Sequence, residues 1–197
     1  MATPALSTPT AARERLRAII QDKSFLYGRF TLSSGRPANY FLDMKPTMLD
    51  PEGANLIADL MLEAIGKEPV DAVGGLAAGC IPIVTLVAAR SFHSAHPIAG
   101  FFVRKEPKGH GTGQWLEGVK TFPKGAELLV VEDVVTTGGS SLKAIQAIRA
   151  AGFVVKQVLT IVDREEGGAA AFAAADVELL PLLKLSQIRS AKSFPIN

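Results

Sequence analysis

The chain has 197 residues, of which 48% are hydrophobic and 20% charged, so we expect a globular domain with a substantial core. A net charge of +2 gives no reason to expect nucleic acid or a membrane surface as a partner, and no apolar run reaches the length of a membrane span. The single cysteine, Cys80, excludes an internal disulfide, and no signal peptide is recognisable, so we expect a cytoplasmic protein.

The first 45 residues predict small elements that lie outside a main sheet. Thr8 followed by Pro9 is typical of a helix start, with the threonine as the cap. Residues 25–30 and 40–43 are expected to be two short strands on either side of a glycine-containing turn. We therefore expect residues 1–45, approximately, to form a small N-terminal hood.

Strands and helices alternate over residues 50–185. Asp50 and Pro51 begin a helix with apolar residues at helical spacing, and Gly66 ends it. Further strands are predicted at 70–75, 97–103, 128–131, 153–162 and 177–183, and further helices at 81–89, 138–151 and 167–174. This alternation predicts an α/β fold in one domain, residues 1–197, with a central parallel sheet flanked by helices.

In such a sheet, ligands bind outside the carboxyl ends of the strands. Two small-residue turns, at 74–79 and 136–140, fall at that edge, as does Asp163-Arg164. The second turn precedes a helix, where unpaired amides, the helix dipole, hydroxyls and glycines favour a bound phosphate. A plain helix cap is the alternative, but it gives no use for the adjacent carboxylates of Glu132 and Asp133. Beside a phosphate, the pair would hold ribose hydroxyls or a metal ion.

The run from Val130 to Ser140 resembles the phosphoribosyl-pyrophosphate (PRPP) motif of type I phosphoribosyltransferases. It lacks the Gly-Lys-Ser/Thr of a Walker loop and the G-x-G-x-x-G of a dinucleotide site. The resemblance implies the type I phosphoribosyltransferase fold for the predicted sheet.

Residues 104–117 have no apolar period and combine basic residues, a histidine and glycines. A solvated surface loop is the plain alternative, but loops of this length are often lids, and the cations suit a polyanion. Arg104-Lys105-Glu106-x-Lys108-x-His110-Gly111 resembles the flexible catalytic loop of orotate phosphoribosyltransferases. We therefore expect a mobile loop over 104–117.

The resemblance extends from about Phe30 to Arg164 and implies a reaction. Orotate and PRPP would give orotidine 5′-monophosphate and pyrophosphate, a step of pyrimidine synthesis, with Mg²⁺ held by PRPP and by no protein ligand directly. It implies catalytic roles for Lys108, His110, Glu132 and Asp133. It implies PRPP binding by Arg104, Lys105, Lys108, His110, Glu132, Asp133, Val134, Val135, Thr136, Thr137, Gly138, Gly139 and Ser140. It implies orotate binding by Phe41, Thr136 and Arg164, and a homodimer in which the loop closes over the neighbour's site.

The sequence departs from the family pattern at a few positions. Ser33 and Gly79 stand where some members have lysine, so the PRPP contacts of those lysines do not carry over. Leu42 stands where some members have a second phenylalanine, and Glu132 replaces the first aspartate of the commoner pair. Two other functions stay open: a phosphoribosyltransferase for another base, and a PRPP-sensing regulator. A regulator would be expected to have a broken loop or a strongly basic face, and this chain has neither.

Overall fold

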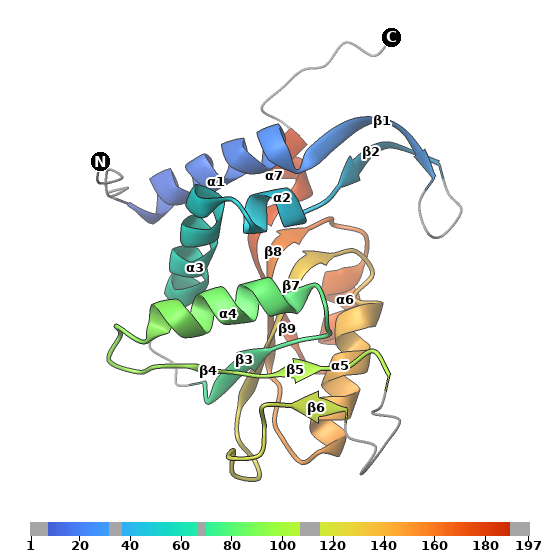
Figure 1. Ribbon diagram of the computed structural model, residues 1–197. Coiled ribbons are helices and arrows are strands. Elements are labelled where there is room, and N and C mark those ends of the chain that lie inside the picture. The colour runs from blue at the N-terminus through green and yellow to red at the C-terminus, as the bar shows by residue number, and fades with distance from the viewer. Residues whose placement is uncertain (1–7, 32–36, 67–69, 107–114, 190–197) are drawn as a thin grey trace.

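The computed structural model describes residues 8–31, 37–66, 70–106 and 115–189 (Figure 1). Its centre is a five-stranded parallel sheet in the order β4-β3-β7-β8-β9, which confirms the predicted fold class. The strands are β3 (Ala72–Gly74), β4 (Ala99–Gly100), β7 (Leu128–Val135), β8 (Gln157–Asp163) and β9 (Glu178–Lys184).

Helices cover both faces of this sheet because alternate residues of its strands are apolar on both sides. Leu129 and Val131 of β7 belong to one core cluster, with α3 (Pro51–Ile65) and α4 (Cys80–Ser91). Leu128 and Val130 belong to a second cluster, with α5 (Gly139–Ala150) and α6 (Gly168–Ala173). A strand buried on both faces reads as an unbroken apolar run, which is the pattern that predicted it.

The hood is built from both ends of the chain. It contains α1 (Pro9–Lys23), the antiparallel hairpin of β1 (Phe25–Thr31) and β2 (Pro37–Leu42), and α2 (Lys45–Met48). Thr8 caps α1 by accepting a hydrogen bond from the Ala11 amide at 3.3 Å, as the sequence predicted. The C-terminal helix α7 (Leu185–Arg189) lies against α1, where the Gln21 amide donates to the carbonyl of Ile188 (Figure 1). The prediction of a hood from residues 1–45 alone therefore missed its C-terminal part.

The predicted strand at 97–103 is wrong as a single unit. Its ends belong to β4 and to β5 (Phe102–Val103), and β5 pairs with β6 (Leu116–Glu117) in a separate two-stranded sheet. Phe101, between them, is buried with its ring against Gly74, where a Cβ would lie 2.5 Å from the ring. The strand β6 falls in the predicted loop, because two residues are too few to show a period.

No helix in the described ranges is long and apolar enough to cross a membrane.

Gly53 allows α3 to pack against α2. A Cβ at this position would lie 2.3 Å from the carbonyl oxygen of Thr47 and 3.0 Å from its Cγ2. Alanine normally stabilises a helix relative to glycine by about 1 kcal/mol, but this contact can be relieved only by moving α2. We expect Gly53→Ala to lower the free energy of unfolding by about 1–3 kcal/mol, as other overpacked sites do.

The matched control is Asn55→Ala, at an exposed position of the same helix, where the gain in helix propensity and the loss of an exposed hydrogen bond to the Pro51 carbonyl roughly cancel, so stability should change little. Chemical denaturation of both variants measures the two changes. A stabilised Gly53→Ala variant would contradict the packing described here.

Candidate active site

The carboxyl ends of β3, β7 and β8 bring both predicted small-residue turns to one edge of the sheet, as expected from the sequence. A cavity of about 180 Å³ lies at the end of β7. Its lining consists of Glu132, Val134, Val135, Thr136, Thr137, Gly138, Gly139, Ser140 and Ser141. Strand end, turn and helix start therefore enclose one small polar space.

The turn at the start of α5 is shaped by close backbone packing. Gly138 has a φ of 79°, and a Cβ there would lie 2.9 Å from the Phe172 ring. A Cβ at Gly168 would lie 2.4 Å from Val135 Cγ1, and the Gly168 amide donates to the Thr136 carbonyl at 3.1 Å. The first amides of a helix have no intrahelical partner, and none of the described side chains caps α5, so these amides are available to an anion.

The acidic pair lies inside β7, not beyond its end. The prediction that the strand stops at residue 131 is wrong because pairing with β8 continues past it, with Glu132 opposite Thr160 and Val134 opposite Val162. A strand's length is set by its partner, which the local sequence does not show. The carboxylates are consequently held by the sheet and not by a mobile turn.

Glu132 is buried, with 8% of its surface exposed, and accepts a hydrogen bond from the Ser141 hydroxyl at 2.6 Å. Burial raises the pKa of Glu132 to about 7, the neighbouring charge of Asp133 adds to the rise, and the Ser141 hydrogen bond opposes it. Asp133 is less buried and accepts from the amide of Val134 at 2.9 Å. Sequence reasoning missed Ser141 as a partner of this pair.

The other turn, at residues 75–79, faces the same carboxylates. A Cβ at Gly79 would lie 3.3 Å from Asp133 Oδ1 and 3.6 Å from Glu132 Oε1, and the peptide between Ala77 and Ala78 is cis. Cys80 is fully buried behind the turn, where burial raises the pKa of its thiol to about 12. A neutral, enclosed thiol is no nucleophile at neutral pH.

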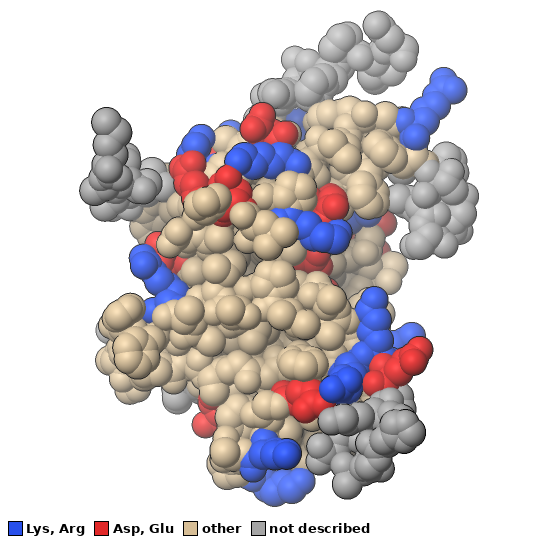
Figure 2. All heavy atoms as spheres, viewed as in Figure 1, with Lys and Arg blue, Asp and Glu red and all other residues tan. Residues whose placement is uncertain are grey.

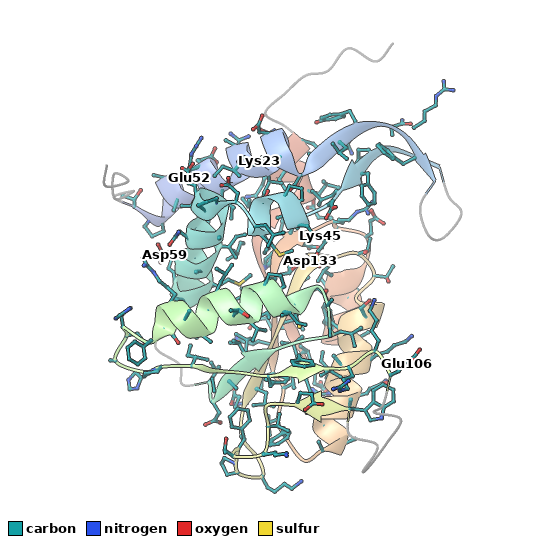
Figure 3. The ribbon with its side chains drawn as sticks, viewed as in Figure 1. Lys23, Lys45, Glu52, Asp59, Glu106 and Asp133 are labelled. Carbon is teal, nitrogen blue, oxygen red and sulfur yellow. The ribbon has the colours of Figure 1, made fainter. Side chains whose placement is uncertain are left out.

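Lys45 is a cation beside this pair that sequence reasoning missed. Its ammonium binds Asp43 at 2.7 Å, and the pKa of Lys45 is raised first by this hydrogen bond and further by the charge of Asp133. Figure 3 shows Lys45 and Asp133 near each other, between α2 and the start of α4. The one signal that could have identified Lys45 in the sequence is its place just after the second hood strand, in Asp43-x-Lys45.

Arg164 lies directly beside the phosphate turn, because its amide donates to the carbonyl of Val135 at 2.9 Å. Its side chain reaches the hood, where Nη2 donates to the hydroxyl of Tyr40 at 2.9 Å. Phe41 follows Tyr40 on the strand and packs instead near Phe30, with the ring centres 5.7 Å apart and 42% of Phe41 exposed. Among the described hood residues, Tyr40 therefore contacts Arg164, whereas Phe41, which is predicted to contact orotate, packs near Phe30.

The described part of the loop is its stem. Arg104 binds Glu117 with Nη2 at 2.7 Å from Oε1, and the Arg104 amide donates to the Trp115 carbonyl at 2.8 Å. Lys105 is exposed, whereas Lys108 and His110 lie outside the described residues. A larger cavity of about 990 Å³ separates this stem from α5, but its lining is mostly apolar and includes neither carboxylate of the pair. The chemistry of a phosphorylated sugar fits the smaller cavity.

The burial of Glu132 predicts a stability that depends on pH. Its pKa in the folded protein, about 7, lies above the ordinary 4.5, so the folded protein holds a proton that the unfolded chain releases between these values. Stability therefore falls as pH rises from about 4.5 to 7. Glu132→Gln removes the ionisation, and we expect it to raise the free energy of unfolding at pH 8 by about 1–3 kcal/mol.

The difference in stability between Glu132→Gln and the wild type should vanish near pH 4, where the Glu132 carboxyl is mostly protonated in the folded and in the unfolded protein. Thermal unfolding of the ligand-free protein at pH 4 and pH 8 measures it. Glu178→Gln, at an exposed glutamate of β9, is the control and should show no such dependence. An equal effect of Glu132→Gln at both pH values would mean that its carboxylate is not held in a charge-disfavouring site.

Comparison with known proteins agrees with this geometry. Residues 47–174 match the model of the family described as the phosphoribosyl transferase domain. An orotate phosphoribosyltransferase of Rhodopseudomonas palustris (strain BisB18) is 48% identical over 180 residues, which cover 90% of this chain and 96% of the relative. The crystal structure of a Mycobacterium tuberculosis H37Rv orotate phosphoribosyltransferase is 36% identical with a TM-score of 0.79, and covers 90% of this chain and 99% of that chain. The same enzyme in complex with PRPP matches at 33% identity and a TM-score of 0.75, covering 90% and 98%. The chain therefore belongs to the orotate phosphoribosyltransferases, within the phosphoribosyl transferase domain family.

Proposed function

We propose that the cavity at the end of β7 binds PRPP and that its phosphoribosyl group is transferred there to orotate, giving orotidine 5′-monophosphate and pyrophosphate. The observation that carries this assignment is the junction of a carboxylate pair and an uncapped helix start in one cavity. A phosphorylated sugar needs hydrogen-bond donors for its phosphate and hydrogen-bond acceptors for its hydroxyls, and this cavity offers both. The turn and the start of α5, residues 136–140, bind the 5′-phosphate. Glu132 and Asp133 accept hydrogen bonds from the ribose hydroxyls.

The same carboxylates suit the transition state. As pyrophosphate leaves C1 of the ribose, positive charge develops on the ring, and Glu132 and Asp133 lie on the strand beside it. Fixed charges aimed at a developing charge contribute more than groups that must reorient, and more still where water is excluded. Val134 and Val135 contribute backbone to the cavity, since Val135 is almost fully buried. No protein nucleophile is needed.

The leaving pyrophosphate is assigned to the cations of residues 104–117. Lys105, Lys108 and His110 are proposed to bind it and to stabilise its growing charge. Arg104 is proposed to act from the stem, where Glu117 orients its guanidinium. The hood, the core sheet and this loop would then form one phosphoribosyltransferase domain.

Magnesium fits this site as a companion of the substrate. Within the described ranges no group of three or more metal-ligating side chains occurs, so the oxygens of PRPP would supply most of the ligands that a hard cation needs. When bound, Mg²⁺ neutralises charge on the pyrophosphate and so eases its departure. A single buried cysteine agrees with our proposal of a cytoplasmic location.

Orotate is assigned to the space between the hood and the β8 end. Arg164 offers a planar fork to its carboxylate, Thr136 lies at the cavity wall, and Phe41 presents an exposed ring. These assignments place the base next to the ribose.

A second copy of the chain is the proposed partner. The outer surface of α4 carries Ile81, Thr85 and Ala89 exposed, and the neighbouring Phe92 is 73% exposed. Figure 2 shows few charged side chains over this region, which α4 occupies in Figure 1. An uncharged surface of this kind is typical of an interface between copies. We propose that α4 lies in the dimer interface and that each loop serves the other subunit's site.

The proposed reaction is tested with purified protein, PRPP, orotate and Mg²⁺. We expect ultraviolet loss of orotate that stops in excess chelator and resumes when Mg²⁺ is restored, since the polyanionic substrate needs a hard cation. Uracil and purine bases, offered in place of orotate, should not be consumed. Equal consumption of another base would assign the chain to the salvage of that base.

Arg164→Lys tests the orotate assignment. The substitution keeps a positive charge but loses the planar fork. We therefore expect kcat/KM for orotate to fall by an amount that corresponds to a loss of about 1–3 kcal/mol of transition-state stabilisation, in line with one charged hydrogen-bonded contact. The KM for PRPP should change little. If only the PRPP constant changes, Arg164 does not bind orotate.

Sharing of the loop is tested by mixing two inactive variants, Lys108→Ala and Asp133→Asn. A mixed dimer would hold one site with an intact loop and intact carboxylates, and another site with both defects. Random exchange of equal amounts should restore roughly a quarter of wild-type activity, from the symmetry of a two-site dimer. Tagged subunits show whether exchange occurs. Exchange without recovery would place each loop in its own subunit's site.

A further inference from the structure

The guanidinium of Arg164 already has partners. Nη2 donates to the hydroxyl of Tyr40 at 2.9 Å and lies 2.7 Å from Oε1 of Glu166. This nitrogen therefore has two close partners, a hydroxyl that accepts its hydrogen bond and a carboxylate that forms an ion pair with it. Nε is buried and has no hydrogen-bond partner in the part of the chain that the structure describes, and only 12% of the Arg164 side chain is exposed. The guanidinium is thus paired with a carboxylate of the protein itself while its Nε donor stays unused among the described residues.

This arrangement conflicts with a second carboxylate. A bidentate contact to a guanidinium uses two neighbouring N–H groups, either Nη1 with Nη2 or Nε with Nη2. Nη2 belongs to both pairs. Tyr40 and Glu166 both lie within 2.9 Å of Nη2, so an incoming carboxylate that binds in this way has to take the place of one of them. Exchange of one carboxylate for another keeps the charge of the site balanced.

Contacts of its ring hold Tyr40 in place, so that its hydroxyl can remain at Arg164 when a ligand binds. Its ring stacks on Phe25 with centres 5.1 Å apart, and the guanidinium centres of Arg164 and Arg189 lie 5.2 Å and 5.6 Å from the ring centre. The hydroxyl accepts from Arg164, so its own hydrogen remains available for donation. A fixed hydroxyl beside the fork can donate to the same ligand that the fork binds.

We propose that Tyr40, Arg164 and Glu166 form a self-occupied carboxylate site, in which Glu166 fills the place of the orotate carboxylate and is displaced when orotate binds. Tyr40 orients Arg164 and donates its O–H to the incoming carboxylate. This inference rests on the proposed assignment of orotate to Arg164. It gives the site its selectivity, because a base without a carboxylate cannot replace the charge of Glu166 and would leave Glu166 in place.

Glu166→Gln is the first test. The variant removes the competing charge with little change of shape, so we expect the KM for orotate to fall about two- to fivefold, as for a partly exposed ion pair, with the KM for PRPP unchanged. The matched control is Glu165→Gln, which removes the same charge from the next residue, where the carboxylate accepts from the Ser186 amide at 2.9 Å. Its KM for orotate should equal that of the wild type.

The sign of the change separates this role from a structural one. Loss of local order would raise the orotate KM, and a long-range charge effect would move both glutamate variants alike. Either result, or no change in Glu166→Gln, overturns the proposal. Only a fall confined to Glu166→Gln supports it.

Tyr40→Phe is the second test, since it keeps the ring and removes the hydroxyl. We expect the orotate KM to rise about three- to tenfold, with the PRPP KM unchanged, as for the loss of one hydrogen bond. An unchanged orotate KM would overturn the role of Tyr40. Arg164→Lys distinguishes the two levels of the argument. If that variant leaves orotate use intact, the proposed orotate position is wrong, whereas a defect there with no effect of Glu166→Gln refutes the self-occupied site alone.

Discussion

The site depends on a carboxylate that the fold holds in an unfavourable place. Glu132 is buried on a strand paired on both sides, next to Asp133, and its charge is disfavoured by burial and by that neighbour. The Ser141 hydroxyl offsets only part of this cost. In exchange, any hydroxyl donor or developing positive charge that enters the cavity meets two acceptors that do not have to reorient, in surroundings where water screens them weakly. If Glu132 has the role that we propose, stability of the ligand-free protein and function at this position are opposed.

Close backbone approach makes that geometry possible. Gly79 lies against the two carboxylates, Gly138 against the Phe172 ring and Gly168 against Val135, each closer than a side chain would allow or nearly so. The turns of β3, β7 and β8 can therefore meet at one edge with little side-chain material between them. The anion that we propose for this cavity would be recognised mainly by amides and by the start of α5, in keeping with a lining of small residues and no cations.

The sequence predicted the parts of this design that have a local pattern. The alternation of apolar strands and helices was enough for the parallel sheet. The Thr-Thr-Gly-Gly-Ser turn behind Glu132 and Asp133 was enough to locate the small polar cavity, where a phosphate site stays a prediction. It did not predict that β7 runs past the carboxylates, since pairing with β8 decides this. Nor did it predict Tyr40 at Arg164, a contact between residues 124 positions apart. Such contacts follow from how the hood packs on the sheet, and neither residue carries a mark of it in its own segment.

The two proposed substrates would consequently be bound by different parts of the fold. The phosphate turn and the acidic pair belong to the sheet edge alone, within β7 and α5. The base end combines the β8 loop with β2 of the hood, and the hood is itself fixed by the contact of α7 with α1. Under these assignments, a change of base preference would involve the hood, residues 164–166 and Thr136, while the acidic pair and the rest of the phosphate turn can remain as they are. Glu166, Arg164 and Tyr40 meet at this seam, and our proposal therefore assigns to it the distinction of one base from another.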